Sequence, residues 1–451
     1  MPRAADVAVV GAGPAGVAAS VGLARAGRRV VVLDRTRFPR DKYCGDGLTT
    51  GALRLLEHLG LDPASVPSWR AATGLVIRSP SGREVAYPFP PDGQYAATAQ
   101  RHDLDAALVD LARRVGVEVL DGCACDGVAV GSDRVALTTP ASGAVHARYA
   151  VAADGMWSPV RRMLGLSLPS YRGDWHAFRQ YYTGVGPQAG EALRVWFEPE
   201  ILPGYVWMFP LPDGAANVGF GVSRATHSTG SLARLWDDLR SRPHIAAVLG
   251  PDACPVDRPR AWPIPSRLGE LPLASGRVLF CGDAAGVCDP MTGEGIGQAL
   301  LSGLLAAEAL VRAGPDDEAA ARRLYRSGVA RHLERDFVFT RMLGGALRSP
   351  AGCNAAVGIS GATPWTRRNF ARWLFEDYPR ALVLTPDRWQ QGALGGGAFA
   401  ARRAHRAASS STRSRMSTNH GHTGRRPRER AASSITRSRM SMNRQMSEND
   451  L

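Results

Sequence analysis

Three glycines near the start of the chain have the spacing of a dinucleotide-binding turn. They follow a short apolar run and precede a segment of small residues. In such a turn the first glycine permits the bend, the second lets the backbone approach a pyrophosphate, and the third lets a helix pack on a strand. The helix N-terminus then offers free N–H groups and a positive dipole to the phosphates. An Asp some twenty residues further on can bond a ribose hydroxyl, so the pattern favours dinucleotide binding over a glycine-rich turn that binds nothing. The predicted contact residues are Gly11, Gly13, Pro14, Ala15, Gly16, Asp34 and Arg35.

A second group of glycines and an acid lies some 270 residues downstream. The apolar run 278–280 is predicted to be a buried strand, and a Gly-Asp pair follows it, where a carboxylate can bond a sugar-alcohol chain. Further glycines then open an apolar helix whose N-terminus can face the pyrimidine edge of an isoalloxazine. A reduced flavin is negatively charged near N1 and O2, which a helix N-terminus stabilises. This second group favours FAD over NAD, and its predicted contact residues are Gly282, Asp283, Gly293, Gly295 and Ile296.

A third group ends another predicted buried strand. Asp154 and Gly155 follow the apolar run from Tyr149, and a helix start comes next. Asp154 taken alone would more often be a turn residue, but in this series we predict that it contacts the nucleotide. The three groups resemble, in order, those of FAD enzymes built like p-hydroxybenzoate hydroxylase. Arg101, with Asp105 four residues later, also resembles the flavin-contacting helix start of that family.

Two further segments are similar to signatures of the geranylgeranyl reductase family, which saturates polyprenyl chains in chlorophyll, archaeal lipid and menaquinone pathways. One is the loop 39–47, which contains Cys44 and Gly45, and the other is the aromatic segment 203–210 followed by 217–219. The resemblance covers roughly residues 5–345. It implies hydride transfer from reduced FAD to a C=C bond of a hydrophobic prenyl-type substrate, with NAD(P)H or another reductant as a transient electron donor.

The aromatic segment has a physical meaning of its own. In a strand, Tyr205, Trp207 and Phe209 share one face while the intervening Val206 and Met208 share the other. Three neighbouring aromatic rings would form a flat apolar wall beside a flavin, although any one of them could equally belong to an ordinary core strand. Such a wall suits an isoprenoid, because apolar burial contributes about 25 cal/mol per Å². We therefore take these three residues, with Cys44, as candidate catalytic residues.

Cys44 has two interpretations. Archaeal members of the family have Cys-x-Gly-Gly, whereas this chain has Cys-Gly-Asp-Gly from Cys44 to Gly47. In one interpretation Cys44 acts near the flavin, and Lys42 and Asp46 tune its pKa. In the other, the loop wraps the adenosine and leaves Cys44 inert.

The main rival function is that of a monooxygenase or halogenase on the same fold. Halogenases of this type pair a Trp-x-Trp-x-Ile-Pro segment with a catalytic lysine. Here the segment is Tyr205-x-Trp-x-Phe-Pro, and the only lysine of the chain, Lys42, lies in the reductase-like loop. Both departures favour the reductase. A non-catalytic protein that binds nucleic acid through its basic tail is a different hypothesis, and the complete set of flavin motifs disfavours it.

The order of these motifs predicts an α/β fold, with a Rossmann-like FAD-binding domain and an inserted substrate lobe of mixed or antiparallel sheet. We expect the FAD-binding domain over 1–170, with a substrate-lobe excursion near 76–95, and again over 265–340. The substrate lobe spans 171–264, a helical C-terminal region spans 341–392, and a basic low-complexity tail, expected to be disordered, spans 393–451.

Composition sets the remaining limits. Of the net charge of +14, +9 lies beyond residue 401, where there are 12 Arg and three acidic residues. This region also contains a sequence repeat, residues 406–417 and 430–441. The seven cysteines are scattered without a CxxC pair, so neither a disulfide framework nor a metal site is predicted. The chain starts on a strand pattern and shows no signal peptide, which predicts a cytoplasmic protein. The apolar stretch near 300–311 is interrupted and shorter than a membrane span, so no crossing is expected. Peripheral membrane contact stays open, and the oligomeric state is undetermined.

Overall fold

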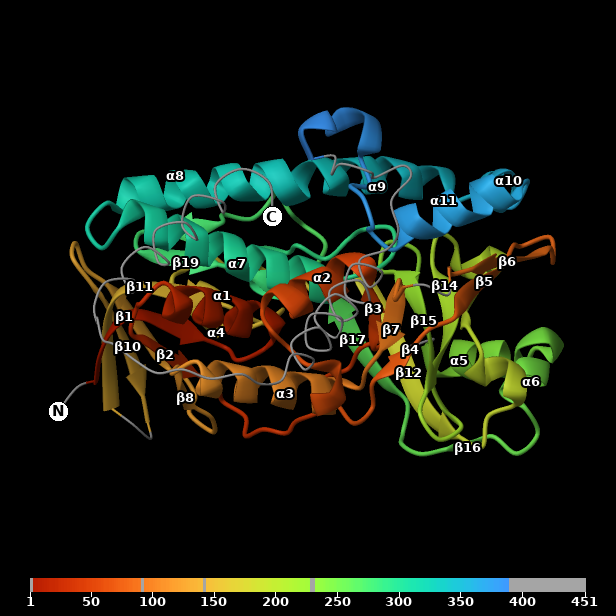
Figure 1. Ribbon diagram of the computed structural model, residues 1–451, viewed down its shortest axis with the longest axis horizontal. Coiled ribbons are helices and arrows are strands. Elements are labelled where there is room, and N and C mark those ends of the chain that lie inside the picture. The colour runs from red at the N-terminus through yellow and green to blue at the C-terminus, as the bar shows by residue number, and fades with distance from the viewer. Residues whose placement is uncertain (1–2, 91–92, 141–142, 228–231, 389–451) are drawn as a thin grey trace, which may run out of the picture.

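A computed structural model of the chain shows two β-sheets side by side, with helices along one long edge (Figure 1). The structure describes residues 3–90, 93–140, 143–227 and 232–388. The predicted basic tail and its repeat lie outside the described residues. The predicted fold class is confirmed, because a Rossmann-like sheet and a second, mostly antiparallel sheet are both present.

The first sheet is built around parallel strands with continuous apolar sequence. Its central order is β18-β19-β11-β1-β2-β8, and β10 and β9 extend it antiparallel from β11. The runs AVV in β1 and VVVL in β2 are rich in branched residues that favour strands, and both are buried. Its strands are β1 (Arg3–Val10), β2 (Val30–Leu33), β8 (Glu118–Leu120), β9 (Gly127–Val130), β10 (Val135–Thr139), β11 (Gly143–Ala152), β18 (Ala274–Ser275) and β19 (Val278–Phe280).

Two closely packed helices cover this sheet: α1 (Pro14–Arg25) and α7 (Ile296–Ala313). A Cβ at Gly303 would lie 2.2 Å from the Ala15 carbonyl oxygen, so only glycine permits this approach. Helix α7 has 18 residues and is apolar enough to span a membrane, which corrects the expectation that the stretch is too short. However, 72% of it is buried inside the protein, as expected for the core helix of a globular fold.

The second sheet has the order β16-β12-β15-β14-β13-β5-β6, with β17 also paired to β12. All its pairs are antiparallel except β13 with β5, which joins the segment near residues 76–95 to the later strands. Its strands are β5 (Gly74–Arg78), β6 (Glu84–Pro88), β12 (Trp175–Thr183), β13 (Leu193–Trp196), β14 (Tyr205–Leu211), β15 (Ala215–Ser223), β16 (Cys254–Pro255) and β17 (Arg260–Ile264). Helices α5 (Leu232–Ser241) and α6 (Pro243–Leu249) pack on one face, with the core side chains Val206 and Met208 beneath them.

A small sheet connects the two larger ones. It consists of β3 (Gly47–Thr49), β7 (Ala96–Thr98) and β4 (Arg70–Ala71), in that order. Strand β3 immediately follows the Cys44 loop and leads into α2 (Thr50–His58), whose N-cap Thr49 accepts a hydrogen bond from the Ala52 N–H. The Cys44 loop is therefore fixed at its end by a strand and a capped helix. The other helices before the C-terminal region are α3 (Arg101–Arg114) and α4 (Pro159–Met163).

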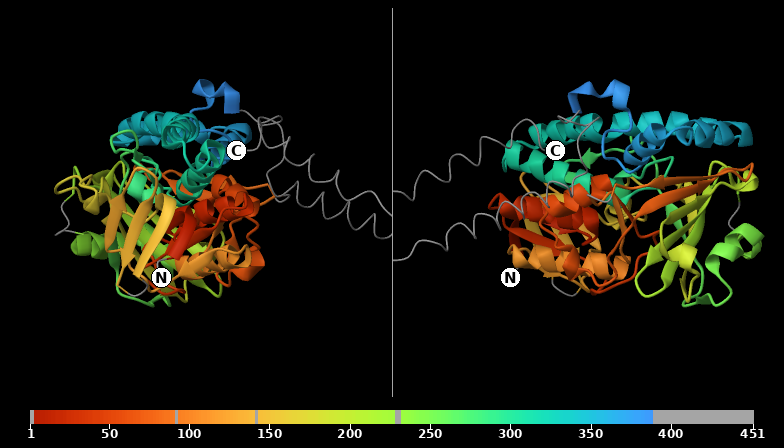
Figure 2. Two further views of the ribbon diagram at one scale, coloured as in Figure 1. Left: turned by 90° about the vertical axis from the view of Figure 1, so that its left-hand side faces the viewer. Right: turned by 45° about the vertical axis from the view of Figure 1, so that its right-hand side comes forward.

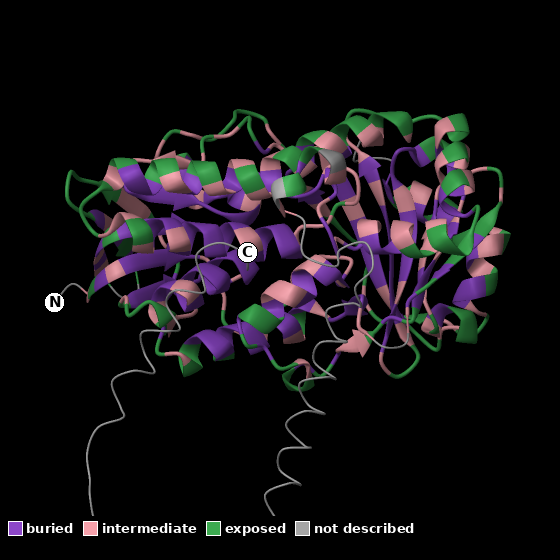
Figure 3. Cartoon of the chain, turned by 45° about the horizontal axis from the view of Figure 1, so that its top comes forward, coloured by how far each residue is buried: buried purple, intermediate pink, exposed green. Residues whose placement is uncertain are grey.

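The C-terminal helices lie on one side of both sheets, as the two further views show (Figure 2). The predicted boundary at residue 340 falls inside α9. Both sheets are mainly buried, whereas these helices alternate between buried and exposed residues (Figure 3). The helices are α8 (Glu318–Val329), α9 (Arg335–Ala346), α10 (Pro350–Ser360) and α11 (Pro364–Leu374).

Candidate active site

A cleft of about 930 Å³ lies at the junction of the two large sheets. Its nucleotide side is formed at the carboxyl ends of β1, β2 and β11, where Val10, Leu33 and Ala153 line it. Its other side is formed by β14 and β17, including the aromatic residues Trp207 and Trp262. Ligands of open α/β sheets bind beyond the carboxyl ends of the strands, which is the position of this cleft. Of the predicted contact residues, all but Gly16 line it.

The three N-terminal glycines have different structural roles. Gly11 has a φ of +99°, and a Cβ there would lie 2.3 Å from the Ala153 carbonyl oxygen. A Cβ at Gly16 would lie 1.8 Å from the Gly11 carbonyl oxygen, so this glycine holds α1 against β1. A Cβ at Gly13 would meet only the Arg40 guanidinium, at 3.7 Å, and no side chain caps the N-terminus of α1. Gly13 thus leaves room and free N–H groups for a pyrophosphate beside a positive charge.

Two carboxylates line the nucleotide side of the cleft. The Asp34 Oδ2 accepts a hydrogen bond from the Ala12 N–H at 2.8 Å, and its Oδ1 accepts one from the Thr36 N–H. The Asp154 Oδ2 accepts one from the Val160 N–H at 2.9 Å, whereas its Oδ1 is buried without a partner in the part of the chain that the structure describes. A buried acceptor of this kind is costly unless it is satisfied, and a nucleotide hydroxyl would satisfy it. The residues present therefore fit FAD.

Arg101 places a second positive charge at the cleft. It is buried at the start of α3 and donates two hydrogen bonds to Asp105, at 2.8 and 2.7 Å. Asp105 is fully buried, and Arg40 lies 3.0 Å from it. This fixed pair holds the Arg101 guanidinium at the cleft wall, which it lines together with Arg40.

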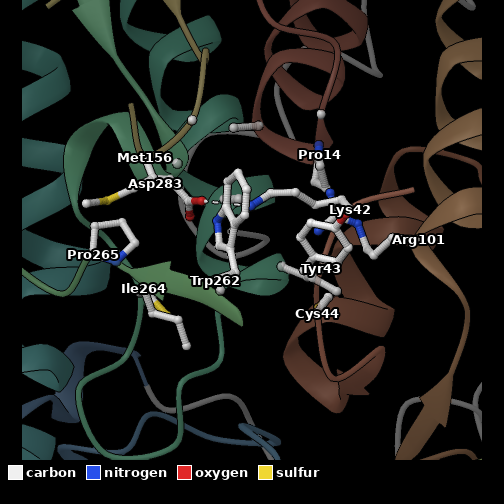
Figure 4. Close-up of a pocket in the computed structure, with 18 of the residues that line it drawn as sticks. Pro14, Lys42, Tyr43, Cys44, Arg101, Met156, Trp262, Ile264, Pro265 and Asp283 are labelled. Carbon is white, nitrogen blue, oxygen red and sulfur yellow. Dashed lines mark ion pairs between the residues drawn. The ribbon is translucent and has the colours of Figure 1, made fainter. Parts of the chain in front are cut away.

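Lys42 reaches across the cleft rather than toward its sequence neighbour Cys44. Its ammonium lies 3.7 Å from the Asp283 carboxylate and 4.1 Å from the centre of the Trp262 ring. Figure 4 shows Lys42 and Asp283 pointing toward each other, with Trp262 beside them. Burial lowers the pKa of Lys42, and the charge of Asp283 partly offsets this. Asp283, predicted to bond the sugar-alcohol chain, is therefore also the ion-pair partner of the only lysine.

Cys44 lines the cleft as a neutral thiol. Burial raises the pKa of Cys44; the charge of Arg101 opposes this and that of Asp46 adds to it. Its sulfur accepts a hydrogen bond from the Asp46 N–H at 3.4 Å. A raised pKa disfavours the thiolate, the form that attacks electrophiles and exchanges disulfides. The structure thus places Cys44 at the cleft without the electrostatics of a reactive cysteine.

The aromatic residues of β14 form a wall of the cleft. The ring centres of Tyr205 and Trp207 are 6.2 Å apart and those of Trp207 and Phe209 are 6.3 Å apart. All three line the cleft, as the strand period predicts. A Cβ at Gly45 would lie 3.6 Å from both Trp207 and Phe209, so the Cys44 loop packs on the wall. The strand is therefore more than an ordinary core strand.

Polar groups bind this loop to the wall. The Trp207 Nε1–H donates to the Asn217 Oδ1 at 2.9 Å. The Asn217 amide donates in turn to the Cys44 carbonyl oxygen and to the Asp46 Oδ2, both at 2.8 Å. Asn217 was part of the second signature, but its position between the wall and the loop follows only from the pairing of β14 with β15.

Two acids at the cleft, Asp46 and Glu294, were not among the predicted site residues. Asp46 is fully buried, and burial raises its pKa to about 6. Glu294 precedes α7, and its Oε1 accepts a hydrogen bond from the Gly297 N–H at 2.8 Å. Burial, followed by the charge of Glu376, raises the pKa of Glu294 to about 8. The departure of Asp46 from the glycine of the family's motif was the available sequence signal; Glu294 gave none.

Metal ions in proteins are held by sets of His, Cys, Asp or Glu ligands. Within the described ranges, no group of three or more His, Cys, Asp or Glu side chains is arranged to hold a metal ion.

The fold, the nucleotide cleft and the aromatic wall define an FAD-dependent oxidoreductase. The FAD binding domain family matches residues 4–315. The chain is 35% identical over 366 residues to menaquinone reductase of Mycobacterium tuberculosis, covering 77% of this chain and 85% of that protein. It is 31% identical over 344 residues to digeranylgeranylglycerophospholipid reductase 1 of Methanopyrus kandleri, covering 71% and 84%. The chain belongs to the geranylgeranyl reductase family of FAD-dependent oxidoreductases, and the predicted resemblance and the predicted FAD are confirmed.

Solved structures show the same fold. A geranylgeranyl bacteriochlorophyll reductase-like protein from Thermoplasma acidophilum superposes with a TM-score of 0.71 at 23% identity, covering 86% of this chain and all of that one. A flavin-dependent halogenase superposes with a TM-score of 0.64 at 22% identity, covering 93% and 79%. At these identities the likeness concerns the fold alone, so it does not choose between reduction and halogenation.

Proposed function

We propose that the protein saturates a C=C bond in the prenyl chain of a hydrophobic substrate. The observation that carries this proposal is the wall of Tyr205, Trp207 and Phe209, which forms one side of the same cleft that holds the nucleotide motifs. An apolar chain lying along the wall would be held beside the flavin ring by burial of its surface. The names of the two relatives, a menaquinone reductase and a digeranylgeranylglycerophospholipid reductase, support a prenyl-bearing quinone or lipid as the substrate.

The protein's own residues have two tasks in this reaction. Reduced FAD, when bound, supplies a hydride from its N5 atom. The wall orients the alkene, and the packed loop 44–47 helps to exclude water from the reacting carbons. The first sheet is the only Rossmann-like sheet in the described residues, so NAD(P)H or another reductant would reach the flavin through the cleft and leave again.

The rival chemistry is oxygenation or halogenation on the same fold. Halogenation would need a lysine free to carry an activated halogen. Here the Lys42 ammonium is held between Asp283 and the Trp262 ring. This engagement supports the reductase, and the assay below separates the three reactions.

We expect the purified holoenzyme to saturate prenyl chains without oxygen. Reduced enzyme, mixed anaerobically with polyprenyl diphosphates or prenylated quinones, should give products heavier by two hydrogens in mass spectrometry. Already saturated analogues are the control and should be unchanged. Turnover that requires O₂ and adds one oxygen would identify a monooxygenase instead, and a halide-dependent gain of one halogen would identify a halogenase.

Exposed apolar and basic residues of the C-terminal helices support a further part of the proposal, peripheral contact of a cytoplasmic protein with anionic lipid. Five of the nine exposed large hydrophobic side chains in the described residues belong to this region: Val338, Met342, Ile359, Trp365 and Leu384. Between residues 335 and 368, the exposed charged side chains of the described chain are all arginines. Basic residues near an anionic surface contribute about 1 kcal/mol each, and apolar side chains add burial in the lipid interface.

Vesicle binding tests this contact. The wild type should co-sediment with vesicles containing phosphatidylglycerol and less with pure phosphatidylcholine. The double variant Met342→Glu, Trp365→Glu should lose most of this binding, because both side chains are 66% exposed and their replacement leaves the core intact. Val256→Glu, at a 61% exposed position immediately after β16, is the control for adding a Glu at an exposed apolar site elsewhere. Unchanged vesicle binding of the double variant would contradict a lipid-binding face. A wild type that is a dimer in solution and becomes a monomer in the double variant would show instead that this face is a protein interface.

A further inference from the structure

Asp46 occupies an unusual backbone position at the cleft. Its φ is +63°, in the left-handed region where Asp and Asn are the most tolerated residues after Gly. It lies between Gly45 and Gly47, both of which pack on the aromatic wall. The loop that packs on the wall therefore carries a carboxyl group, and Asp46 lines the cleft.

One oxygen of this carboxyl is satisfied and the other is not. The Oδ2 accepts hydrogen bonds from the Tyr181 hydroxyl at 2.6 Å and from the Asn217 amide at 2.8 Å. The Oδ1 is buried and has no hydrogen-bond partner among the described residues. A proton on Oδ1 would remove the negative charge of the buried carboxylate, which burial penalises, and would leave an O–H free to be donated to a substrate.

We propose that Asp46 is the general acid that delivers the proton to the second carbon of the alkene. The inference rests on the proposed function. The π bond of the alkene breaks; one carbon receives the hydride and its two electrons from reduced FAD, and the other receives the proton from the Asp46 Oδ1. The flavin is thereby oxidised, and the Asp46 carboxylate regains a proton from water before the next turnover.

The groups around Asp46 set its protonation. Burial is the largest influence and raises the pKa of Asp46 to about 6. The Tyr181 hydroxyl on β12 and the Asn217 amide on β15 stabilise the carboxylate through hydrogen bonds, and the charges of Arg179 on β12 and Arg101 on α3 do so at longer range. A pKa near the working pH is the usual property of a general acid, because the group then both holds and releases its proton.

Two other proton-bearing groups at the cleft, Glu294 and Cys44, are worse placed. The Glu294 Oε1 is already bonded to the Gly297 N–H at the start of α7, and its strongest charged neighbours, Glu376 and Arg380, belong to the C-terminal region. The thiol of Cys44 holds its proton more tightly, because burial raises the pKa of a group that starts higher. Asp46 alone among them lies between two residues that contact the wall and has a buried oxygen without a partner.

Asp46→Asn is the direct test. Asn keeps the shape, tolerates the left-handed backbone and can still accept from Tyr181, so the variant should fold and bind FAD. Reduction of its flavin by dithionite should match the wild type, whereas its anaerobic saturation rate should fall by about 10²- to 10⁴-fold. The wild-type rate should fall tenfold per pH unit above about 6, and the variant should lose this dependence. Asp213→Asn, the same change at a left-handed residue in an exposed turn, should leave both unchanged.

Tyr181→Phe is a second variant that does not remove the acid. Losing the hydroxyl removes a hydrogen bond that stabilises the carboxylate, so the pKa of Asp46 should rise. The midpoint of the pH–rate profile should therefore move to higher pH while saturation persists. A purely structural role of Asp46 predicts no such shift, so an unmoved midpoint would overturn the proposal even if Asp46→Asn failed to fold.

Thermal stability gives a readout that needs no turnover. A carboxyl whose folded pKa lies above its unfolded value makes the folded state less stable as the pH rises through that interval, here from about 4 to about 6. The wild type loses this stability between about pH 4 and pH 6, and Asn cannot ionise. The Tm of Asp46→Asn minus the Tm of the wild type should therefore be larger at pH 8 than at pH 4. A Tm difference that is independent of pH would contradict a raised pKa of Asp46.

The failure of the proposed function and the failure of the role of Asp46 are distinguishable. If the wild type saturates no prenyl chain, the proposed function fails. If the wild type does so and Asp46→Asn keeps its rate and pH profile, only the role of Asp46 fails.

Discussion

Gly13→Val should give a folded protein that retains no FAD. A Cβ at this position meets only the flexible end of Arg40, at 3.7 Å, so the new side chain points into the cleft instead of clashing with the backbone. It would occupy the space that a pyrophosphate needs beside the first N–H groups of α1. Absorbance of the purified protein and flavin released on denaturation measure the loss, and circular dichroism verifies the fold.

Two other glycines, Gly16 and Gly344, give the contrast. Gly16→Val should destabilise the fold itself, because its Cβ would lie 1.8 Å from the Gly11 carbonyl oxygen. Gly344→Ala on α9, where no atom lies within 4 Å of an added Cβ, should keep both flavin and fold. A Gly13→Val protein that retains its full flavin would show that the pyrophosphate does not lie at this turn.

Trp207→Ala should abolish most saturation activity while leaving flavin reduction intact. Trp207 is 5% exposed and forms the middle of the wall. Its removal opens a cavity, and truncating a buried Trp costs about 3–5 kcal/mol in a closed core, less at a cleft surface. A displacement of the alkene by about 1 Å can lower the rate on the order of a hundredfold. Stopped-flow measurement of the reductive and saturating half-reactions separates the two effects.

Two variants sharpen this result. Trp365→Ala removes a 66% exposed Trp of α11 and should change neither half-reaction when both are measured without vesicles. Trp207→Phe keeps an aromatic ring but removes the Nε1–H that bonds Asn217, which in turn bonds Asp46. The saturation activity of Trp207→Phe should therefore fall less than that of Trp207→Ala, and the pH dependence of its saturation rate should change. Equal loss of flavin reduction and saturation in Trp207→Ala would place Trp207 in cofactor binding instead of substrate binding.

The nucleotide half of the cleft could be predicted from sequence because it depends on local rules. A glycine with positive φ, a free helix N-terminus and an acid at the end of a strand each have a short-range signature, as Gly11 and Asp34 show. The face of β14 that carries Tyr205, Trp207 and Phe209 also followed from the period of a strand. The strand period did not show which segment packs against that face. The loop 44–47 packs there because the two large sheets meet at the cleft.

The sequence by itself determined the family, the cofactor, the fold class and the aromatic face of β14. The tertiary structure decided which charges meet. Lys42 pairs with Asp283, and Asp46 pairs with Tyr181 and Asn217, 135 and 171 residues away along the chain. Protonation depends on burial and on such distant partners, and no local pattern encodes either. The acid of the proposed reaction therefore became visible only when the fold had buried Asp46 and left one of its oxygens without a partner.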